Sequence, residues 1–274
     1  MTPDPDTVLE ERHGEVAVLR LNLPQRLNPL ALPLQQALRA HLARLADDRS
    51  VRALVLTGAG KGFCVGADLA SMQAPPAGQS LGAQTAAAME ALSNRLIEDL
   101  RQMPFPVLSA VNGPCAGAGV GLALAADVVL VARSAYFYLP FMPRLGIVPD
   151  LGCTWFLERL LGRSRAVALS LLGERLSGEQ AAQWGLAWAC VDDAALGEQA
   201  LGEQALALAQ RLARLPAHAA REIRSVYEHA AQHSLNEQMR HEAERQRELI
   251  DRPEFAEGVQ AFLAKREPEF APRS

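Results

Sequence analysis

The chain has 274 residues, of which 49% are hydrophobic, 21% charged and 5% aromatic, and its formal net charge at pH 7 is −4. This balance is typical of a soluble globular protein with one large core. Few aromatic residues and no basic stripe disfavour nucleic acid as a partner. The polar, acidic start and four widely spaced cysteines without a Cys-x-x-Cys motif lead us to expect a cytoplasmic protein with reduced thiols and no zinc site.

The first 70 residues predict strands alternating with a helix. Short strands are expected at 7–11 and 16–21, followed by a loop at 22–29 with two prolines and Arg26. Leucines spaced along one face predict a helix over 31–45, and Ala-Leu-Val-Leu-Thr over 53–57 predicts a buried strand. A glycine cluster follows in 58–69. This alternation favours parallel strands joined by crossovers.

The stretch Asn112–Asp127 is the centre of the chain because it is rich in glycine and lies between two apolar runs, 107–111 and 128–132. We read it as strand, tight turn, helix and strand. Glycine lets a ligand approach the backbone closely, and the first turn of a helix has unpaired N–H groups with a partial positive charge. This stretch is therefore a candidate site for negative charge on a ligand oxygen.

Residues 107–133 admit two other interpretations, a transmembrane helix and a dinucleotide-binding loop. A transmembrane helix with Gly-xxx-Gly spacing is disfavoured because Asn112-Gly113-Pro114 would break it and Asp127 lies inside it. A dinucleotide-binding loop is disfavoured because the glycines follow a Gly-x-Gly-x-Gly spacing and no early βαβ unit places them.

Residues 71–82 hold prolines and glycines with little apolar content and are a candidate mobile loop or lid. A helix is expected over 84–103, and 135–150 reads as irregular. Further helices are expected over 151–161, 163–172 and 178–184, with a capping box at Ser177 and Gln180, and a last strand over 186–191.

From residue 194 the chain reads as helical, over 194–212, 218–229, 235–250 and 253–265, with a capping box at Ser234 and Glu237. We therefore divide it into an α/β core domain, 1–193, and a helical C-terminal region, 194–274. The helix 235–250 is either a subunit contact or a solvated amphipathic helix. His229 and His233 have a metal-binding spacing, but no carboxylate motif accompanies them, so no metal is expected.

Four motifs in order resemble the crotonase (enoyl-CoA hydratase/isomerase) superfamily. They are Asn22-Leu-Pro-Gln-Arg-Leu-Asn-Pro-Leu30, Leu56-Thr-Gly-Ala-Gly-Lys-Gly-Phe-Cys-Val-Gly-Ala-Asp-Leu69, Val111-Asn-Gly-Pro-Cys-Ala-Gly-Ala-Gly-Val-Gly121 and Gly146-Ile-Val-Pro-Asp-Leu-Gly152. The resemblance implies a ββα spiral core with a helical C-terminal trimerisation region. It also implies trimers or hexamers and an acyl-CoA thioester substrate, with coenzyme A as part of that substrate and no other cofactor.

The resemblance also implies site residues. An oxyanion hole would be formed by the backbone N–H groups of Ala67 and Ala118, which catalyse by holding a developing enolate oxygen. The positions that match coenzyme A contacts are Arg26, Leu27, Gly66, Ala67, Asp68, Leu69, Gly117 and Ala118. A solvated loop arginine is an equal interpretation of Arg26.

Departures from the family pattern decide the reaction. The two glutamates of a hydratase fall at Gly121 and Met142, neither of which can transfer a proton. Asp150 remains, at a position where several superfamily members place a catalytic aspartate, although it could instead be the N-cap of a helix beginning at Leu151.

With Asp150 present and both glutamates absent, the resemblance implies an acyl-CoA isomerase that shifts a double bond or rearranges a ring epoxide. It would be of the 1,2-epoxyphenylacetyl-CoA or 3-enoyl-CoA type, in phenylacetate or fatty acid metabolism. The alternatives are a 2-enoyl-CoA hydratase and a non-catalytic binding or scaffold protein. A thiol nucleophile at Cys64 or Cys115 is also conceivable, but no histidine is motif-linked to either, so buried packing is favoured.

Overall fold

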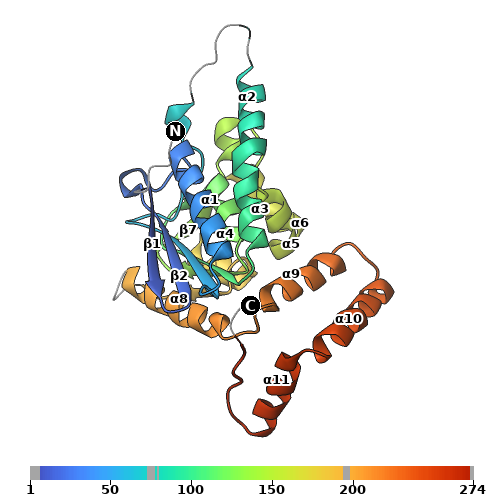
Figure 1. Cartoon of the computed structure of the whole chain (residues 1–274). Helices are drawn as coiled ribbons and strands as arrows, with labels where there is room; N and C mark the ends of the chain where they lie inside the picture. The colour runs from blue at the N-terminus through green and yellow to red at the C-terminus, as the bar shows by residue number, and fades with distance from the viewer. Residues whose placement is uncertain (1–6, 73–77, 79, 194–197, 272–274) are drawn as a thin grey trace.

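A computed structural model describes residues 7–72, 78, 80–193 and 198–271 of the chain (Figure 1). Its main sheet has six strands in the order β1-β2-β3-β4-β6-β9. The strands are β1 (Val8–His13), β2 (Val16–Leu21), β3 (Ala53–Gly58), β4 (Val107–Val111), β6 (Val128–Ala132) and β9 (Ala189–Val191). The pair β1 and β2 is antiparallel, and every later pair is parallel, as the alternating pattern predicted. Because β3 and β4 are buried along their whole length, this sheet is the centre of the core.

A second sheet has three short strands, β5 (Cys115–Ala116), β7 (Tyr136–Tyr138) and β8 (Leu176–Ser177). The sequence did not predict it, and the expectation that 135–150 is irregular throughout was wrong at β7. Strands of two or three residues are too short for an alternating pattern, and they form here because distant segments pair with them. A single π-helical turn, Phe141–Leu145, follows β7.

The helices of the core differ from the predicted ones mainly at their ends. They are α1 (Leu32–Asp47), α2 (Leu81–Ala88), α3 (Asn94–Gln102), α4 (Ala118–Leu124), α5 (Cys153–Leu161), α6 (Arg163–Leu172) and α7 (Gly178–Trp184). The helix expected from residue 84 begins at Leu81, since the Ser80 hydroxyl accepts from the Ala83 amide, and a π turn (Met89–Ser93) separates α2 from α3. Half of the predicted lid, residues 73–77 and 79, lies outside the described residues, and its last two residues, Leu81 and Gly82, belong to α2.

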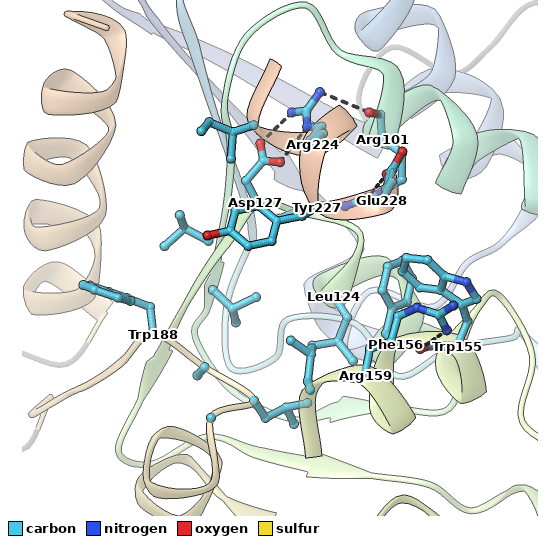
Figure 2. Close-up of a pocket in the computed structure, with 18 of the residues that line it drawn as sticks. Arg101, Leu124, Asp127, Trp155, Phe156, Arg159, Trp188, Arg224, Tyr227 and Glu228 are labelled. Atoms are coloured by element: carbon cyan, nitrogen blue, oxygen red, sulfur yellow. Dashed lines mark hydrogen bonds and ion pairs between the residues drawn. The ribbon is translucent and has the colours of Figure 1, made fainter. Parts of the chain in front are cut away.

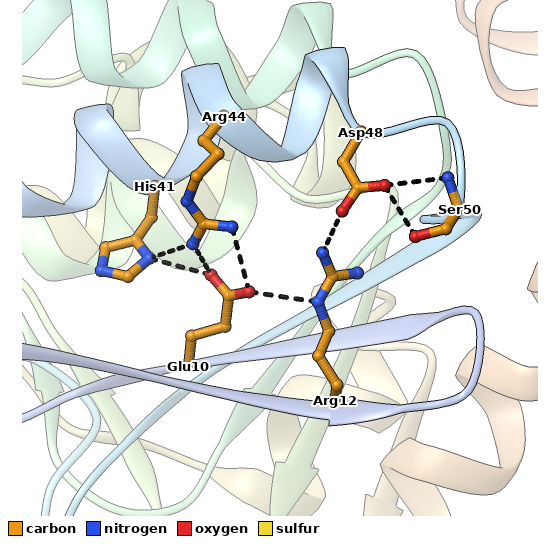
Figure 3. A network of polar contacts seen from close by, with 6 residues as sticks. All are labelled: Glu10, Arg12, His41, Arg44, Asp48 and Ser50. Carbon is orange, nitrogen blue, oxygen red and sulfur yellow. Dashed lines mark hydrogen bonds and ion pairs between the residues drawn. The ribbon is translucent and has the colours of Figure 1, made fainter.

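A polar network joins the β1–β2 hairpin to α1 (Figure 3). The Glu10 carboxylate accepts from Arg12 and Arg44 and lies 2.9 Å from Nδ1 of His41, while Arg12 also contacts Asp48. Burial alone would raise the pKa of Glu10, but the hydrogen bonds from Arg44 and His41 outweigh it, so the pKa is lowered. His41 is thus a boundary residue bound to a carboxylate.

The C-terminal helices divide into two parts. Helix α8 (Glu198–Ala213) packs against strands β2, β3, β4, β6 and β9, whereas α9 (Ala219–Ala230), α10 (Leu235–Ile250) and α11 (Pro253–Leu263) project from the body as an arm (Figure 1). The predicted capping box of α10 is present. Arg52, almost fully buried, donates to the carbonyls of Leu215 and Phe270 and so ties both ends of the arm to the core. The predicted domain boundary falls beside residues 194–197, outside the described part of the chain.

The transmembrane interpretation of residues 107–133 is wrong. The stretch folds as β4, β5, the seven-residue helix α4 and β6. In the described ranges, no helix combines the length and apolarity that crossing a bilayer requires.

Candidate active site

Two glycine turns bring the predicted oxyanion residues together. Gly66 has φ +84° and Gly117 has φ +53°, both in the region that favours glycine. A Cβ on Gly66 would lie 2.8 Å from the Ala118 nitrogen and 2.9 Å from the Ala116 carbonyl oxygen. The turn that precedes Ala67 therefore touches the start of α4.

The amides of Ala67 and Ala118 are available to a ligand. Ala118 is the first residue of α4, where backbone N–H groups have no partner inside the helix. Within the described residues, neither amide donates to a protein acceptor. Because Gly66, the residue before Ala67, lies against Ala118, the two amides are candidates to hold one carbonyl oxygen.

Two buried asparagines hold the glycine loop after β3, and sequence reasoning missed both roles. Asn28, fully buried, accepts from the Leu23 amide at 2.8 Å and donates to the carbonyls of Ala59 and Gly62 at 3.0 and 2.8 Å. Asn112 accepts from the Gly58 amide at 3.1 Å and donates to the Gly60 carbonyl at 2.8 Å. Both side chains thereby fix the glycine loop after β3.

Most of the predicted coenzyme A contacts lie on the loops before α1 and after β3, whereas Gly117 and Ala118 are at the start of α4. The exposed guanidinium of Arg26 donates to the carboxylate of Asp68, whose side chain is largely buried. Leu27, with φ +58°, packs close to Gly62, while Leu69 is about half exposed. The structure therefore brings Arg26 beside Asp68 with its side chain still about half exposed, so both interpretations of this arginine stay open.

Asp150 lies on the turn before α5. Its Oδ1 is buried and has no hydrogen-bond partner in the described part of the chain. Burial raises the pKa of Asp150 to about 6, against an opposing hydrogen bond from its own backbone amide. A carboxyl group with a pKa near neutrality is suited to both accepting and returning a proton.

The N-cap interpretation of Asp150 is wrong. Helix α5 begins at Cys153, and its N-cap is Gly152, with no side-chain cap. Leu151 and Gly152 have φ of +46° and +76°, so the chain turns through two left-handed residues before the helix can start. The Asp150 side chain is consequently not needed to cap the helix.

The two hydratase positions differ in their surroundings. A Cβ on Gly121 would lie 2.2 Å from the Leu151 carbonyl oxygen, so any side chain there requires the backbone to move. Met142 is 40% exposed and lines an apolar cavity of about 300 Å³ together with Val148 and Pro149. Neither residue is itself an acid, although Glu158 also lines the cavity beside Met142.

The cysteines and histidines singled out earlier have structural surroundings. Cys64, Cys115 and Cys153 are free and fully buried, and burial raises the pKa of each, that of Cys64 to about 12. Such thiols are poor nucleophiles. His229 stacks between His233 and His241, with ring centroids 3.7 and 4.1 Å apart. Among the described residues, no group of three or more metal-ligating side chains is arranged to hold a metal.

A cavity of about 670 Å³ lies between the body and α9 (Figure 2). Asp127 and Arg224 face each other on one side, and Trp155, Phe156 and Arg159 stand on the other. This cavity meets α4 at its last residue, Leu124, whereas Ala118 is at the opposite end. It is therefore separate from the turns described above.

Comparison with known proteins gives a consistent family. A family model described as enoyl-CoA hydratase/isomerase matches residues 11–273. The chain is 41% identical to 1,2-epoxyphenylacetyl-CoA isomerase of Escherichia coli K12, covering 96% of this chain and 97% of the relative. It is 39% identical to a probable enoyl-CoA hydratase of Rhodobacter capsulatus, covering 97% and 98%.

The same similarity is seen in solved structures. A putative enoyl-CoA hydratase/isomerase of Mycobacterium abscessus superposes with a TM-score of 0.87 at 34% identity, covering 97% of this chain and all of that one. An enoyl-CoA hydratase of Polaromonas sp. JS666 superposes with the same TM-score, 0.87, at 30% identity. The chain belongs to the enoyl-CoA hydratase/isomerase family and has the crotonase fold.

Proposed function

We propose that the protein is an acyl-CoA isomerase in which Asp150 moves a proton along the acyl chain. The observation that carries the proposal is the partly buried Asp150 carboxyl group, whose buried Oδ1 has no hydrogen-bond partner in the described part of the chain and whose pKa is raised to about 6. Relatives named as an isomerase and as probable hydratases are almost equally similar, so the choice between the two reactions rests on the site.

The mechanism uses two parts of the site. The amides of Ala67 and Ala118 donate to the thioester carbonyl oxygen and stabilise the negative charge that develops there. Asp150 takes a proton from C2 of a 3-enoyl-CoA, and the electron pair delocalises into a dienolate. Asp150 then returns the proton to C4, so that the double bond lies between C2 and C3 and no atom is gained or lost. Rearrangement of a ring epoxide to a seven-membered oxepin is the related outcome.

The positions of Gly121 and Met142 favour isomerisation over hydration. A hydratase needs acids that activate a water molecule, but the Leu151 carbonyl closes the first position and an apolar cavity surrounds the second. Water addition would have to proceed without a glutamate at either family position.

We further propose that coenzyme A binds along Arg26, Leu27, Gly66, Asp68, Leu69 and Gly117, and that the reaction needs no other cofactor. Assembly into trimers or hexamers would use the arm, whose apolar residues Phe262 and Leu263 are 84% and 76% exposed. Cytoplasmic location remains a prediction of the sequence.

The test supplies a 3-enoyl-CoA and a 2-enoyl-CoA separately and follows products by mass spectrometry. We expect a 2-enoyl product of unchanged mass from the first substrate, and loss of turnover by about 10² to 10⁴ in Asp150→Asn. Asp251→Asn, an exposed acid on the arm, is the matched control and should keep full turnover. Efficient gain of one water by the 2-enoyl-CoA, without isomerisation, would establish the hydratase instead.

A further inference from the structure

The carboxylate of Asp150 accepts a hydrogen bond from its own backbone amide. Its Oδ1 has no hydrogen-bond partner among the described residues, so no neighbouring side chain orients that oxygen. The next residue, Leu151, is buried and has φ +46°, a conformation that is unfavourable for a leucine and persists only where its surroundings impose it. The orientation of the acid therefore depends on what fixes this turn.

The turn is fixed by helix α4. The Leu151 carbonyl oxygen lies against Gly121, only 2.2 Å from where a Cβ would stand, so the two backbones are in direct contact. Gly121 is three residues after Ala118, in the same helix that supplies one of the two oxyanion amides. The contact thus connects the proposed acid to the proposed oxyanion hole through one turn of helix.

Cys153 forms a second connection. Its backbone amide donates to the Asp150 carbonyl at 2.9 Å, and its Sγ–H donates to the Gly117 carbonyl at 3.8 Å. Gly117 directly precedes Ala118. The buried thiol therefore joins the same two segments through a second contact.

We propose that Gly121, Leu151 and Cys153 are positioning residues that set the place of the Asp150 carboxylate relative to the Ala118 amide. The inference rests on the proposed function, because it gives these residues a role only if Asp150 is the acid. A displacement of about 1 Å between reacting groups can cost about 10² in rate, so the small movements that these contacts prevent are large enough to matter.

The first variant is Gly121→Ala, whose added Cβ must push the Leu151 carbonyl away. We expect kcat to fall by about 10², with KM for the acyl-CoA within about threefold of the original enzyme. The pH at which the rate is half-maximal should also move, since the burial of Asp150 changes. Gly178→Ala is the matched control: its Cβ would lie 2.3 Å from the Ala132 carbonyl oxygen, an equally close contact outside the site. Its kcat and pH profile should stay unchanged.

The second pair of variants keeps the test decisive if Gly121→Ala does not fold. Cys153→Ala removes the donor to Gly117, whereas Cys153→Ser retains one. We expect kcat to fall in the alanine variant and to be restored at least in part by serine, with KM unchanged in both.

The outcomes separate the inference from the proposed function. Full turnover in Asp150→Asn would overturn the proposed function and this inference with it. The inference alone would be overturned if Asp150→Asn loses turnover but kcat is unchanged in folded Gly121→Ala. Unchanged kcat in both Cys153 variants would overturn it in the same way.

Discussion

The glycine-rich nucleus around the candidate site and the helical arm are held together by different physical means. We define the nucleus as residues 58–68, 112–124 and 150–153. In it, backbone contacts backbone: a Cβ on Gly58, Gly113 or Gly119 would lie only 2.1 to 2.3 Å from the carbonyl oxygen of Gly62, Lys61 or Cys64.

In the arm, α9–α11, side chains supply the connections. Arg245 pairs with Glu222 between α10 and α9, Arg266 pairs with Glu257, and a capping box starts α10. Large apolar residues such as Phe262 remain exposed. Because these glycines leave no room for a Cβ, even the smallest substitution in the nucleus should disturb the site. Substitutions of exposed side chains in the arm should be tolerated much better.

The largest expected effect concerns Asp150, the acid of the nucleus: the rate of the reaction should depend strongly on pH. Because Asp150 must be ionised to accept a proton and its pKa is raised to about 6, kcat/KM should fall about tenfold per pH unit below about pH 6. A pH–rate profile on a stable substrate thioester checks this. A rate that stays level down to about pH 4, the ordinary range of an aspartate, would contradict the environment assigned to Asp150.

The next effect concerns the stability of the nucleus. Asn28→Ala leaves the Leu23 amide and the carbonyls of Ala59 and Gly62 without their partner, and we expect a loss of about 2 to 3 kcal/mol in the free energy of unfolding. Urea denaturation measures it. The matched change in the arm, Asn236→Ala, removes an exposed side chain and should cost under about 0.5 kcal/mol. Equal losses in the two variants would contradict the contrast between the nucleus and the arm.

A smaller effect on stability is expected from the carboxyl group of Asp150. Because the pKa of Asp150 is raised in the folded state, folding favours its protonated form. The wild-type protein should therefore lose stability as pH rises from about 3.8 to about 6, and its stability should change little from this cause at higher pH. Asp150→Asn carries no such charge and should be more stable above about pH 6. We expect about 1 to 2 kcal/mol, after allowing for solvent screening of a partly exposed group. Thermal unfolding at pH 4 and pH 8 should show the gain at pH 8 alone.

The smallest effect on chain stability is expected at the C-terminal end of α11. Phe262→Ser should change the unfolding free energy of the isolated chain by under about 0.5 kcal/mol, because the ring is already exposed. Under the proposed assembly it should weaken self-association, which sedimentation velocity measures. A strongly destabilised chain would mean that Phe262 belongs to a core.

The sequence predicted much of the fold because long elements carry periodic patterns. The leucine face of α1, the apolar strands β3 and β4, and the capping boxes of α7 and α10 could all be read locally. The three-stranded sheet was missed because its strands are too short for such patterns and depend on partners far along the chain.

The site shows the same limit. The glycine motifs pointed to Ala67, Ala118 and Asp150 through family resemblance, and the structure places Gly66 against Ala118 as expected. The buried role of Asn28 could not be read, since an asparagine in a loop gives no sign of burial. The sequence also could not predict that the Leu151 carbonyl lies against Gly121, because this contact depends on a left-handed turn that sequence patterns do not specify.

The central claim is that Asp150 moves a substrate proton, and solvent deuterium exchange tests it most directly. Acyl-CoA thioesters would be incubated in D₂O with the original enzyme and with Asp150→Asn, and deuterium at the carbon next to the carbonyl would be measured by mass spectrometry. The account predicts exchange by the original enzyme that is lost in the variant, whose binding of coenzyme A persists. Exchange that continues at the same rate in Asp150→Asn would contradict it.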